Sequence, residues 1–297
     1  MQPELELSVI LTTYQRPEHL ERSLASLALQ RGVAGRFEVI VTDDGSQDHT
    51  HDIVREFART ADFPVKLITH PHDGFRVALC RNDGVRASSA PYFLFSDSDC
   101  IFPPNHVRGH LKARRPGVIR AGHCYRLDRE ATERLDVAAV VANAYRKCVA
   151  PVERRRMMRR WISDKYYQWT RHAARPKLTG CNIAIWRRDL EAVNGFDEDF
   201  VGWGCEDDDL AIRLRAIGRR IVSVIGYTRA YHMWHPLDPS HPGVWNQGAN
   251  VSRLVLGDKP ARCKRGLVVL PDAVPCDESP GAPAGRQPAR RPLTRVA

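Results

Sequence analysis

Short apolar runs alternate with amphipathic segments over the first hundred residues of the chain. Four runs are rich in β-branched or aromatic residues and are short enough to be buried strands: residues 7–11, 37–41, 65–68 and 92–95. Three segments between them carry apolar residues at helical spacing: residues 19–29, 48–61 and 76–87. This alternation predicts an α/β fold with a mostly parallel, doubly wound sheet, in which ligands bind at the carboxyl ends of the strands.

The rest of the chain divides by composition. Residues 125–177 are compatible with helix and strongly basic, with ten Lys or Arg against two acids between Arg146 and Arg175. Beyond Pro271 the chain is rich in Pro, Gly, Ala and Arg, which predicts disorder. The predicted divisions are a domain at 1–258, its two halves at 6–124 and 178–258 around the basic insertion at 125–177, and a C-terminal extension at 259–297.

Composition and charge narrow the classes of protein. The formal net charge is +10 and the isoelectric point about 9.4, which would suit nucleic acid, an anionic membrane or an anionic substrate. No two of the eight cysteines have C-x-x-C spacing, so we expect buried free thiols in a reducing compartment, not a paired-cysteine zinc site. Residues 1–6 have no basic or long apolar run, and the apolar stretch at 137–142 is too short to span a bilayer. We therefore predict a cytoplasmic protein.

A pair of carboxylates follows the fourth predicted strand. Asp97 and Asp99 flank Ser98, and in an extended stretch side chains at i and i+2 share one side, where like charges repel. A divalent cation between the pair and a diphosphate would relieve the repulsion, because Mg²⁺ and Mn²⁺ take oxygen ligands. An isolated pair of this kind is more often a turn or a helix cap in which aspartates accept backbone amides.

Two further acidic clusters also follow apolar segments or turns. Asp43 and Asp44 end the second predicted strand, where a carboxylate would either accept hydrogen bonds from a ribose or base edge or cap the next helix. Residues 206–209 are four consecutive acids at the start of a helical pattern, and the helix dipole accounts for two of them. Repulsion among the others would raise one carboxyl pKa toward the range of a general base. Trp203 offers a flat face for a sugar, although a plain capped helix also explains this segment.

Two histidines follow the apolar segment at 221–225. A histidine in such a place is usually structural, but either His232 or His235 would complete a metal shell begun by the aspartates. Four other histidines have no acidic pattern around them in the sequence. We expect these to be surface or packing residues: His70, His72, His106 and His110.

The order of these motifs resembles a known family. The chain resembles the family 2 glycosyltransferases, whose nucleotide-sugar-binding fold is called GT-A. Four segments carry the resemblance: the strand that runs into Thr12 and Tyr14, V-T-D-D-G-S-Q-D at 41–48, R-N-D-G at 81–84 and D-S-D at 97–99. The segment at 195–210 resembles the C-terminal signature shared by β-1,4-galactosyltransferases and bacterial chondroitin-polymerase-like enzymes. The resemblance covers about residues 6–236. It departs from the signature at Cys205, where a second glycine is usual.

The resemblance implies a GT-A fold with a nucleotide-sugar-binding half and helical acceptor-side additions. It implies an inverting transfer of a sugar from a nucleotide sugar, with a UDP-sugar as the expected donor, to a hydroxyl of a glycan or glycolipid in surface polysaccharide or glycoconjugate synthesis. Mn²⁺ or Mg²⁺ would be the cofactor. Asp207 would be the catalytic base, with Glu206 beside it and with Glu206 and Trp203 binding the acceptor. The implied donor contacts are Thr12, Tyr14, Asp44, Arg81 and Asp97, and the implied metal ligands are Asp97, Asp99 and His232, with His235 as a rival.

Two other classes of protein share some of these features. A metal-dependent sugar nucleotidyltransferase also needs strand-end carboxylates, but the Glu206-Asp207 signature with Trp203 argues against it. A non-catalytic binding module would use the positive charge, yet the basic residues lie outside the α/β half and have few interleaved aromatic residues. We therefore expect no nucleic-acid partner. The basic insertion would suit an anionic acceptor or peripheral association with the inner face of a membrane, and a solvated helical face explains it equally well.

Overall fold

The computed structural model of the chain describes residues 4–241, 243, 248–255 and 260–271. A seven-stranded sheet forms its centre, in the order β3-β2-β1-β4-β8-β6-β9. Its strands are β1 (Leu7–Thr13), β2 (Phe37–Asp43), β3 (Val65–Thr69), β4 (Tyr92–Asp97), β6 (Val118–Ala121), β8 (Ile183–Trp186) and β9 (Arg220–Ser223). Only β8 runs antiparallel to its neighbours in this sheet, so the prediction of a mostly parallel sheet is confirmed.

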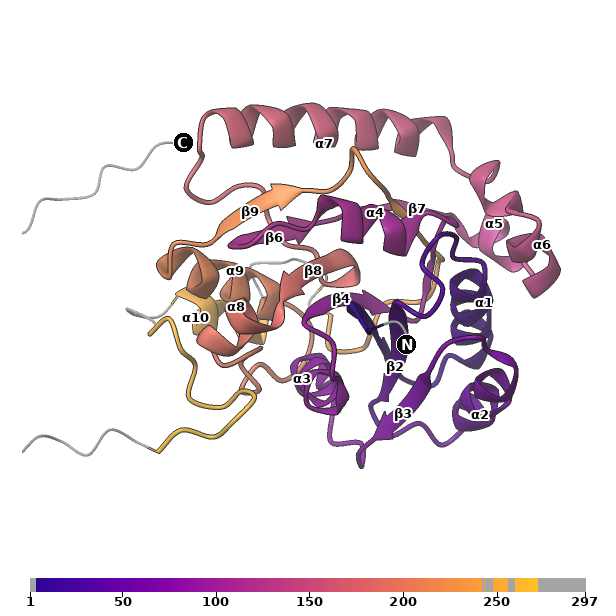
Figure 1. Cartoon of the computed structure of the whole chain (residues 1–297), viewed down its shortest axis with the longest axis horizontal. Coiled ribbons are helices and arrows are strands. Elements are labelled where there is room, and N and C mark those ends of the chain that lie inside the picture. The colour runs from indigo at the N-terminus through magenta and orange to yellow at the C-terminus, as the bar shows by residue number, and fades with distance from the viewer. Residues whose placement is uncertain (1–3, 242, 244–247, 256–259, 272–297) are drawn as a thin grey trace, which may run out of the picture.

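Helices cover both faces of the sheet, as Figure 1 shows. Alternate residues of β1 point to opposite faces, since Val9 and Leu11 lie in one hydrophobic cluster and Ile10 lies in another. The first cluster includes the apolar side of α1 (Pro17–Ala28), and the second includes residues of α3 (Val77–Ala87). The remaining helices of the two covering layers are α2 (Thr50–Thr60), α4 (His106–Ala113), α8 (Arg187–Ala192), α9 (Glu206–Ala216) and α10 (Ala249–Val255). The helices predicted in the first hundred residues are thus present.

A second sheet of three short strands lies beside the carboxyl end of β4. It has the order β5-β10-β7, with β5 at Cys100–Ile101, β10 at Ala230–His232 and β7 at Cys124–Arg126. β10 pairs with β5 so that His232 faces Cys100. This pairing brings two segments more than 100 residues apart in the sequence into direct contact next to Asp99.

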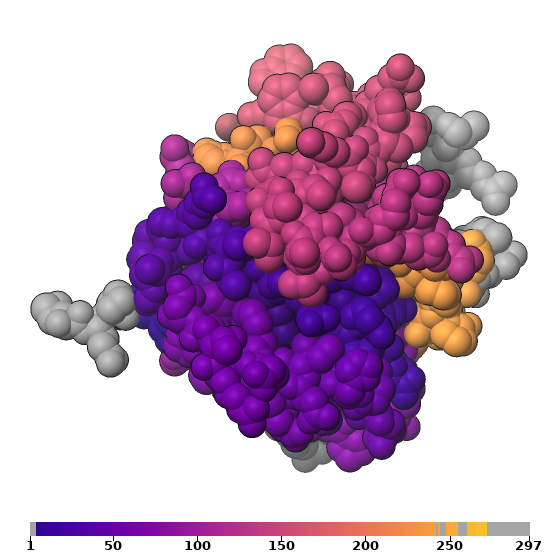
Figure 2. Space-filling model, turned by 90° about the vertical axis from the view of Figure 1, so that its right-hand side faces the viewer, coloured from indigo at the N-terminus to yellow at the C-terminus, as the bar shows by residue number. Residues whose placement is uncertain are grey.

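The basic insertion is helical, as predicted. It contains α5 (Arg129–Glu133), α6 (Val137–Val141), a 3₁₀ turn at Ala144–Arg146 and the long helix α7 (Pro151–Trp169). A separate apolar cluster that includes Leu135, Val140 and Met233 anchors it. In the space-filling view of Figure 2 the magenta-to-pink chain of this insertion lies over the indigo N-terminal half.

Two further predictions concern cysteines and membrane spans. All seven described cysteines are free thiols, and six of them are buried, while Cys276 and the tail beyond residue 271 lie outside the described residues. Among the helices that the structure describes, none combines the length and apolar character needed to cross a bilayer.

Candidate active site

The carboxyl ends of β1 and β4 place the first pair of candidate residues. Thr12 and Asp97 face each other in the parallel register, and the Thr12 hydroxyl donates to Asp97 Oδ1 at 2.9 Å. The backbone N–H of Ser98 donates to the carbonyl of Thr12 at 2.9 Å. These bonds fix the turn that carries Asp99, so the D-S-D segment has one defined orientation at the edge of the sheet.

Asp99 and the two rival histidines form one group with metal-ligand character. His235 Nε2 lies 3.1 Å from Asp99 Oδ2, and His232 Nε2 lies 3.5 Å from Asp99 Oδ1. One ligand atom from each of the three lies within 4.8 Å of the other two. Asp97 is not part of this group. The structure therefore brings both histidines to Asp99 and leaves the choice between them open.

Electrostatics keep the Asp99 carboxylate ionised. Burial alone would raise the pKa of Asp99, but His232 and His235 outweigh it and hold that pKa well below its usual range. Arg16 adds a permanent positive charge, with Nη1 at 3.4 Å from Asp99 Oδ2. Arg16 drew no attention in the sequence because it belongs to no motif. One ionised carboxylate with two imidazoles is a donor set that suits a divalent transition-metal ion.

Asp208 and Asp209 of the four-acid run have structural partners. Asp208 Oδ2 accepts from the Lys177 ammonium at 3.0 Å, at the surface. Asp209 is buried and accepts from Arg213 Nε at 2.7 Å, while Arg213 also donates to the carbonyls that end α8 and its following turn. Because a buried charge must be paired, Asp209 belongs to the packing of α9 and not to the site.

Arg81 joins the two halves of the site. Its side chain is almost fully buried, its Nη1 donates to Glu206 Oε1 at 2.9 Å, and its Nη2 lies 3.4 Å from Asp97 Oδ1. The guanidinium also lies over the ring of Phe196, with 5.2 Å to the centroid. A Cβ at Gly180 would lie 2.3 Å from Nη2, so only glycine leaves room for this arginine. The resemblance implied that Arg81 contacts the donor, and the structure places it between Asp97 and Glu206.

Asp207 has the electrostatic properties of a general base. It is partly buried, and its two oxygens accept the backbone N–H of Gly180 at 3.1 Å and of Asp208 at 2.8 Å. Desolvation, followed by the negative charges of Glu206 and Asp208, raises the pKa of Asp207 to about 7, against the opposing effect of Arg81. A carboxyl group with that pKa is half ionised near neutral pH and takes up a proton more readily than an ordinary aspartate.

The two aspartates after β2 have different surroundings. Asp43 is buried and accepts from the backbone N–H groups of Gly45 and Ser46, at 3.2 and 2.9 Å. These bonds are those of a turn that caps the next segment, the alternative to a ribose or base contact for this pair. Asp44 Oδ1 lies 2.9 Å from His70 Nε2, and Asp44 Oδ2 accepts from the backbone N–H of Arg76 at 3.1 Å. The loop is compact, since a Cβ at Gly45 would lie 2.4 Å from the backbone nitrogen of His72.

Of the four other histidines, only His70 departs from the expectation of a surface or packing residue, whereas His72 is exposed and packs on Tyr14. His70 lies between two carboxylates, with Nε2 on Asp44 and Nδ1 at 3.2 Å from Asp83 Oδ2. The ring of His72 stacks on Tyr14 with 4.2 Å between centroids and 9° between planes. The acids of His70 are 26 and 13 residues away in the sequence, so no local pattern reveals them. His106 and His110 are fully buried packing residues, as predicted.

Trp203 lies in a turn of left-handed residues that precedes α9. Gly202 and Gly204 have φ of +82° and +91°, and Cys205 has φ of +74°. Cys205 therefore keeps the conformation for which glycine is usual, at a cost of roughly 1–2 kcal/mol. The Trp203 ring lies 4.1 Å from that of His241, centroid to centroid.

Two protein families match different parts of the chain. Residues 8–115 match the family described as glycosyl transferase family 2, and residues 161–236 match the family described as N-terminal domain of galactosyltransferase. The chain is 32% identical to validoxylamine A glucosyltransferase of Streptomyces hygroscopicus subsp. jinggangensis, over 91% of this chain and 62% of that protein. It is 28% identical to chondroitin synthase of Escherichia coli, over 77% of this chain and 35% of that protein. The chain thus spans less than two thirds of the length of these relatives.

Solved structures share the fold. The mannosyltransferase PcManGT of Pyrobaculum calidifontis, in complex with GDP-Man and Mn²⁺, matches with a TM-score of 0.52 at 22% identity, over 73% of this chain and 54% of that one. GalNAc-T7 with UDP, GalNAc and Mn²⁺ matches with a TM-score of 0.57 at 15% identity, over 84% of this chain and 48% of that one. The predicted GT-A fold is confirmed.

Proposed function

We propose that this chain, whose residues 8–115 match glycosyl transferase family 2, transfers a sugar from a nucleotide sugar to a hydroxyl of a glycan or glycolipid acceptor, with inversion at the anomeric carbon. One observation carries the proposal: buried Arg81 ties Asp97, on the donor side, to Glu206, beside the proposed base Asp207. Such a link would hold the donor side and the acceptor side of the site at a fixed separation. This lowers the entropic cost of bringing the acceptor hydroxyl to the anomeric carbon.

The donor would bind at the carboxyl ends of β1, β2 and β4. The residues of this half that we assign to the donor are Thr12, Tyr14, Asp44, Arg81 and Asp97. Tyr14 offers a ring already stacked on His72, and Asp44 offers a carboxylate at the end of β2 for a base or ribose. A UDP-sugar is the proposed donor, and in this assignment residues 6–124 hold the donor while residues 178–258 hold the acceptor.

Mn²⁺ or Mg²⁺ fits the group at Asp99, with Asp99 as the central ligand, His232 or His235 as the second, and Asp97 toward the ribose and the ion. An imidazole ligand favours Mn²⁺, because Mg²⁺ prefers oxygen ligands throughout. When bound, the ion supplies positive charge that stabilises the departing diphosphate. The protein's own contribution is an ionised Asp99 held in place by the short β5–β10 pairing.

Proton transfer would belong to Asp207. Asp207 accepts the proton of the acceptor hydroxyl, the hydroxyl oxygen forms a bond to the anomeric carbon, and the bond from that carbon to the diphosphate breaks. One displacement inverts the configuration and leaves the proton on Asp207. Glu206, held by Arg81, would accept a hydrogen bond from the acceptor, and Trp203 would stack on its sugar ring.

The exposed face of α7 supports peripheral association with an anionic membrane surface on the cytoplasmic side. Figure 1 shows α7 along the outer edge of the molecule. Four large apolar side chains are exposed there at helical spacing: Met158, Ile162, Tyr166 and Trp169. Basic side chains flank them on the same exposed surface: Arg154, Arg155, Arg159 and Lys165. Apolar insertion combined with attraction to anionic lipid is how interfacial helices bind membranes, at about 1 kcal/mol for each basic residue near the surface.

Vesicle sedimentation tests the membrane assignment. We expect the protein to sediment with vesicles of phosphatidylglycerol and to stay in solution with phosphatidylcholine. Ile162→Asp should reduce binding at least tenfold, and Leu237→Asp, at a site of similar exposure away from α7, should not. Equal binding to both lipids, or equal loss in both variants, would contradict it.

A panel of nucleotide sugars tests the transfer reaction. Each donor is incubated with Mn²⁺ and a mixture of glycan acceptors, and the release of nucleoside diphosphate is measured. We expect release with a UDP-sugar and dependence on acceptor. Release of pyrophosphate instead would favour the sugar nucleotidyltransferase, and no release with any donor would favour a binding module.

A further inference from the structure

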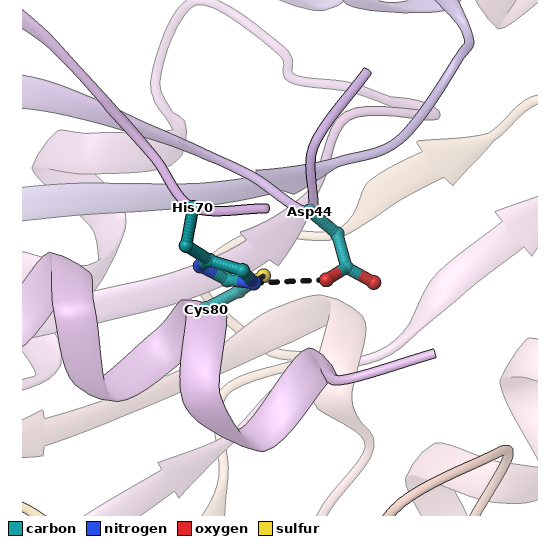
Figure 3. A group of neighbouring side chains, drawn as sticks. All are labelled: Asp44, His70 and Cys80. Carbon is teal, nitrogen blue, oxygen red and sulfur yellow. Dashed lines mark hydrogen bonds and ion pairs between the residues drawn. The ribbon is translucent and has the colours of Figure 1, made fainter. Parts of the chain in front are cut away.

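Three side chains outside the Asp99 group converge on one point. Asp44 follows β2, His70 follows β3 and Cys80 lies on α3, so three separate elements contribute (Figure 3). His70 Nε2 lies 2.9 Å from Asp44 Oδ1 and 4.0 Å from Cys80 Sγ. One ligand atom from each residue lies within 4.8 Å of the other two. A carboxylate oxygen, an imidazole nitrogen and a sulfur thus face a common centre.

We propose that Asp44, His70 and Cys80 bind a soft divalent cation of the zinc type, at a site distinct from Asp99. Tetrahedral zinc with ordinary bond lengths would need about 3.4 Å between nitrogen and oxygen and about 3.6 Å between nitrogen and sulfur. The present separations, 2.9 and 4.0 Å, differ from these by only about half an ångström each. Rotations of the side chains suffice, and water would take the fourth position from the exposed edge of His70.

Asp83 orients His70 as a carboxylate commonly orients a metal-bound histidine. Asp83 Oδ2 lies 3.2 Å from His70 Nδ1, on the side of the ring away from Cys80 and Asp44. If Nδ1 carries the proton, Nε2 has its lone pair directed at the common centre. Arg86 in turn holds Asp83 through a 2.7 Å bond to its other oxygen. This supporting contact is independent of the three ligands and points to the same centre.

The charges around Cys80 also favour a cation. The Cys80 side chain is almost fully buried, and burial together with the charges of Asp44 and Asp83 raises the pKa of its thiol well above the ordinary value. A bound cation would displace the thiol proton to solvent and offset the acidic charges gathered at this corner.

The two metal-capable groups differ in the ions they select. The group at Asp99 offers oxygen and nitrogen, whereas the Cys80 group adds a thiolate, which favours Zn²⁺ over Mn²⁺. The two sites would therefore fill with different ions from one mixture. Because Asp44 also belongs to the proposed donor site, zinc would compete with donor; this consequence rests on the proposed function, whereas zinc binding itself does not.

Cobalt absorption tests the site on the full chain without donor. Co²⁺ bound through a thiolate gives a ligand-to-metal charge-transfer band in the near ultraviolet, and the Asp99 group has no thiolate among its three members. We expect the band in the wild type, at one Co²⁺ per chain, and its loss on addition of Zn²⁺. A wild type without the band would overturn the proposal, and this measurement needs no variant to fold.

Three variants assign the ligand. Cys80→Ser should abolish the band, while Cys100→Ser should keep it; Cys100 is the matched control because its Sγ lies 3.6 Å from Asp99 Oδ1. Asp83→Asn should weaken zinc binding roughly 10–100-fold, since it disturbs the orientation of His70 and leaves the three ligands in place, although it also removes the ion pair with Arg86. A band that survives in Cys80→Ser, or disappears in Cys100→Ser, would place the thiolate elsewhere and overturn the proposal.

A donor-binding titration separates this inference from the proposed function. If both hold, Zn²⁺ at Mn²⁺ saturation weakens UDP-sugar binding in the wild type and has less effect in Cys80→Ser. A cobalt band without any donor binding would support the zinc site and count against the transferase. Donor binding without a cobalt band would support the transferase and count against the zinc site.

Discussion

Asp207 is the residue on which the proposed chemistry depends, and Asp207→Asn is the perturbation that tests it. Asparagine keeps the shape of the side chain and the carbonyl oxygen that accepts the backbone N–H of Asp208. It cannot take the proton of an acceptor hydroxyl. A positioned general base contributes typically ~10²–10⁴-fold to a rate, so we expect kcat to fall by that factor. Donor affinity should change much less than kcat, because the side chain of Asp207 is hydrogen-bonded to the backbone N–H groups of Gly180 and Asp208 and reaches the donor half only through the charge of Arg81.

The pH profile of the wild type gives a second magnitude. Because the pKa of Asp207 is raised to about 7, its ionised fraction rises from about one tenth at pH 6 to about nine tenths at pH 8. The rate should therefore rise about tenfold over that range and level off above it. An aspartate with an ordinary pKa would give a flat profile there. The assay is release of nucleoside diphosphate at saturating donor, and a flat profile would refute the assignment of this pKa to the base.

Asp208→Asn is the matched control for the cause of the shift. It removes one of the two negative neighbours that raise the pKa of Asp207. The rise of the pH–rate profile should therefore move to lower pH, and the ratio of the rates at pH 8 and pH 6 should shrink. Its own partner is Lys177, whose ammonium donates to Asp208 Oδ2 at 3.0 Å in a half-buried pair, so the variant also loses this pair and its unfolding is measured alongside. If the rise of the pH–rate profile moved to higher pH in this variant, repulsion by Asp208 would not contribute to the raised pKa of Asp207.

Stability gives a readout of Asp207 that is independent of catalysis. A carboxyl group whose pKa is raised on folding favours the folded state only while protonated, so wild-type stability falls as pH rises from about 4 to about 7. Asp207→Asn has no such dependence. Relative to wild type, its free energy of unfolding should be higher by more than about 1 kcal/mol at pH 8 than at pH 4. An equal difference at both values would contradict the raised pKa.

Three further predictions concern the metal group and the loop after β2. Asp99→Ala should abolish Mn²⁺-dependent binding of the donor, measured by calorimetry with and without Mn²⁺; donor binding by the wild type that needs no metal would contradict the assignment. His232→Ala and His235→Ala, compared by Mn²⁺ titration, should differ at least tenfold in affinity, with the larger loss identifying the ligand; no loss in either would remove both. Gly45→Ala should lower the free energy of unfolding by about 2 kcal/mol or more in urea, because φ is +82° and the added methyl would meet the backbone of His72; an unchanged midpoint would refute the strain.

Several features of the site could be predicted from the sequence because they are local. A short run such as residues 7–11 is both too apolar and too β-branched to be anything but a buried strand, and the polar residues after it must lie at the carboxyl end of the sheet. Thr12, Asp44 and Asp97 were located in this way and do lie at neighbouring strand ends. The raised pKa of Asp207 has one local cause, the neighbouring acids Glu206 and Asp208, whereas its larger cause is burial in the folded structure.

The tertiary structure decided the contacts between segments that are far apart in the chain. Both His232 and His235 reach Asp99 only because β10 pairs with β5, and no spacing in the sequence encodes that pairing. Arg81 reaches Glu206 across 125 residues, and His70 reaches Asp44 and Asp83 because the ends of β2 and β3 lie beside α3. The sequence determined which groups stand at the ends of the elements, since periodicity and turn chemistry are local. Which charges neutralise one another, and so which pKa values shift, depended on distances that exist only once the sheet has formed.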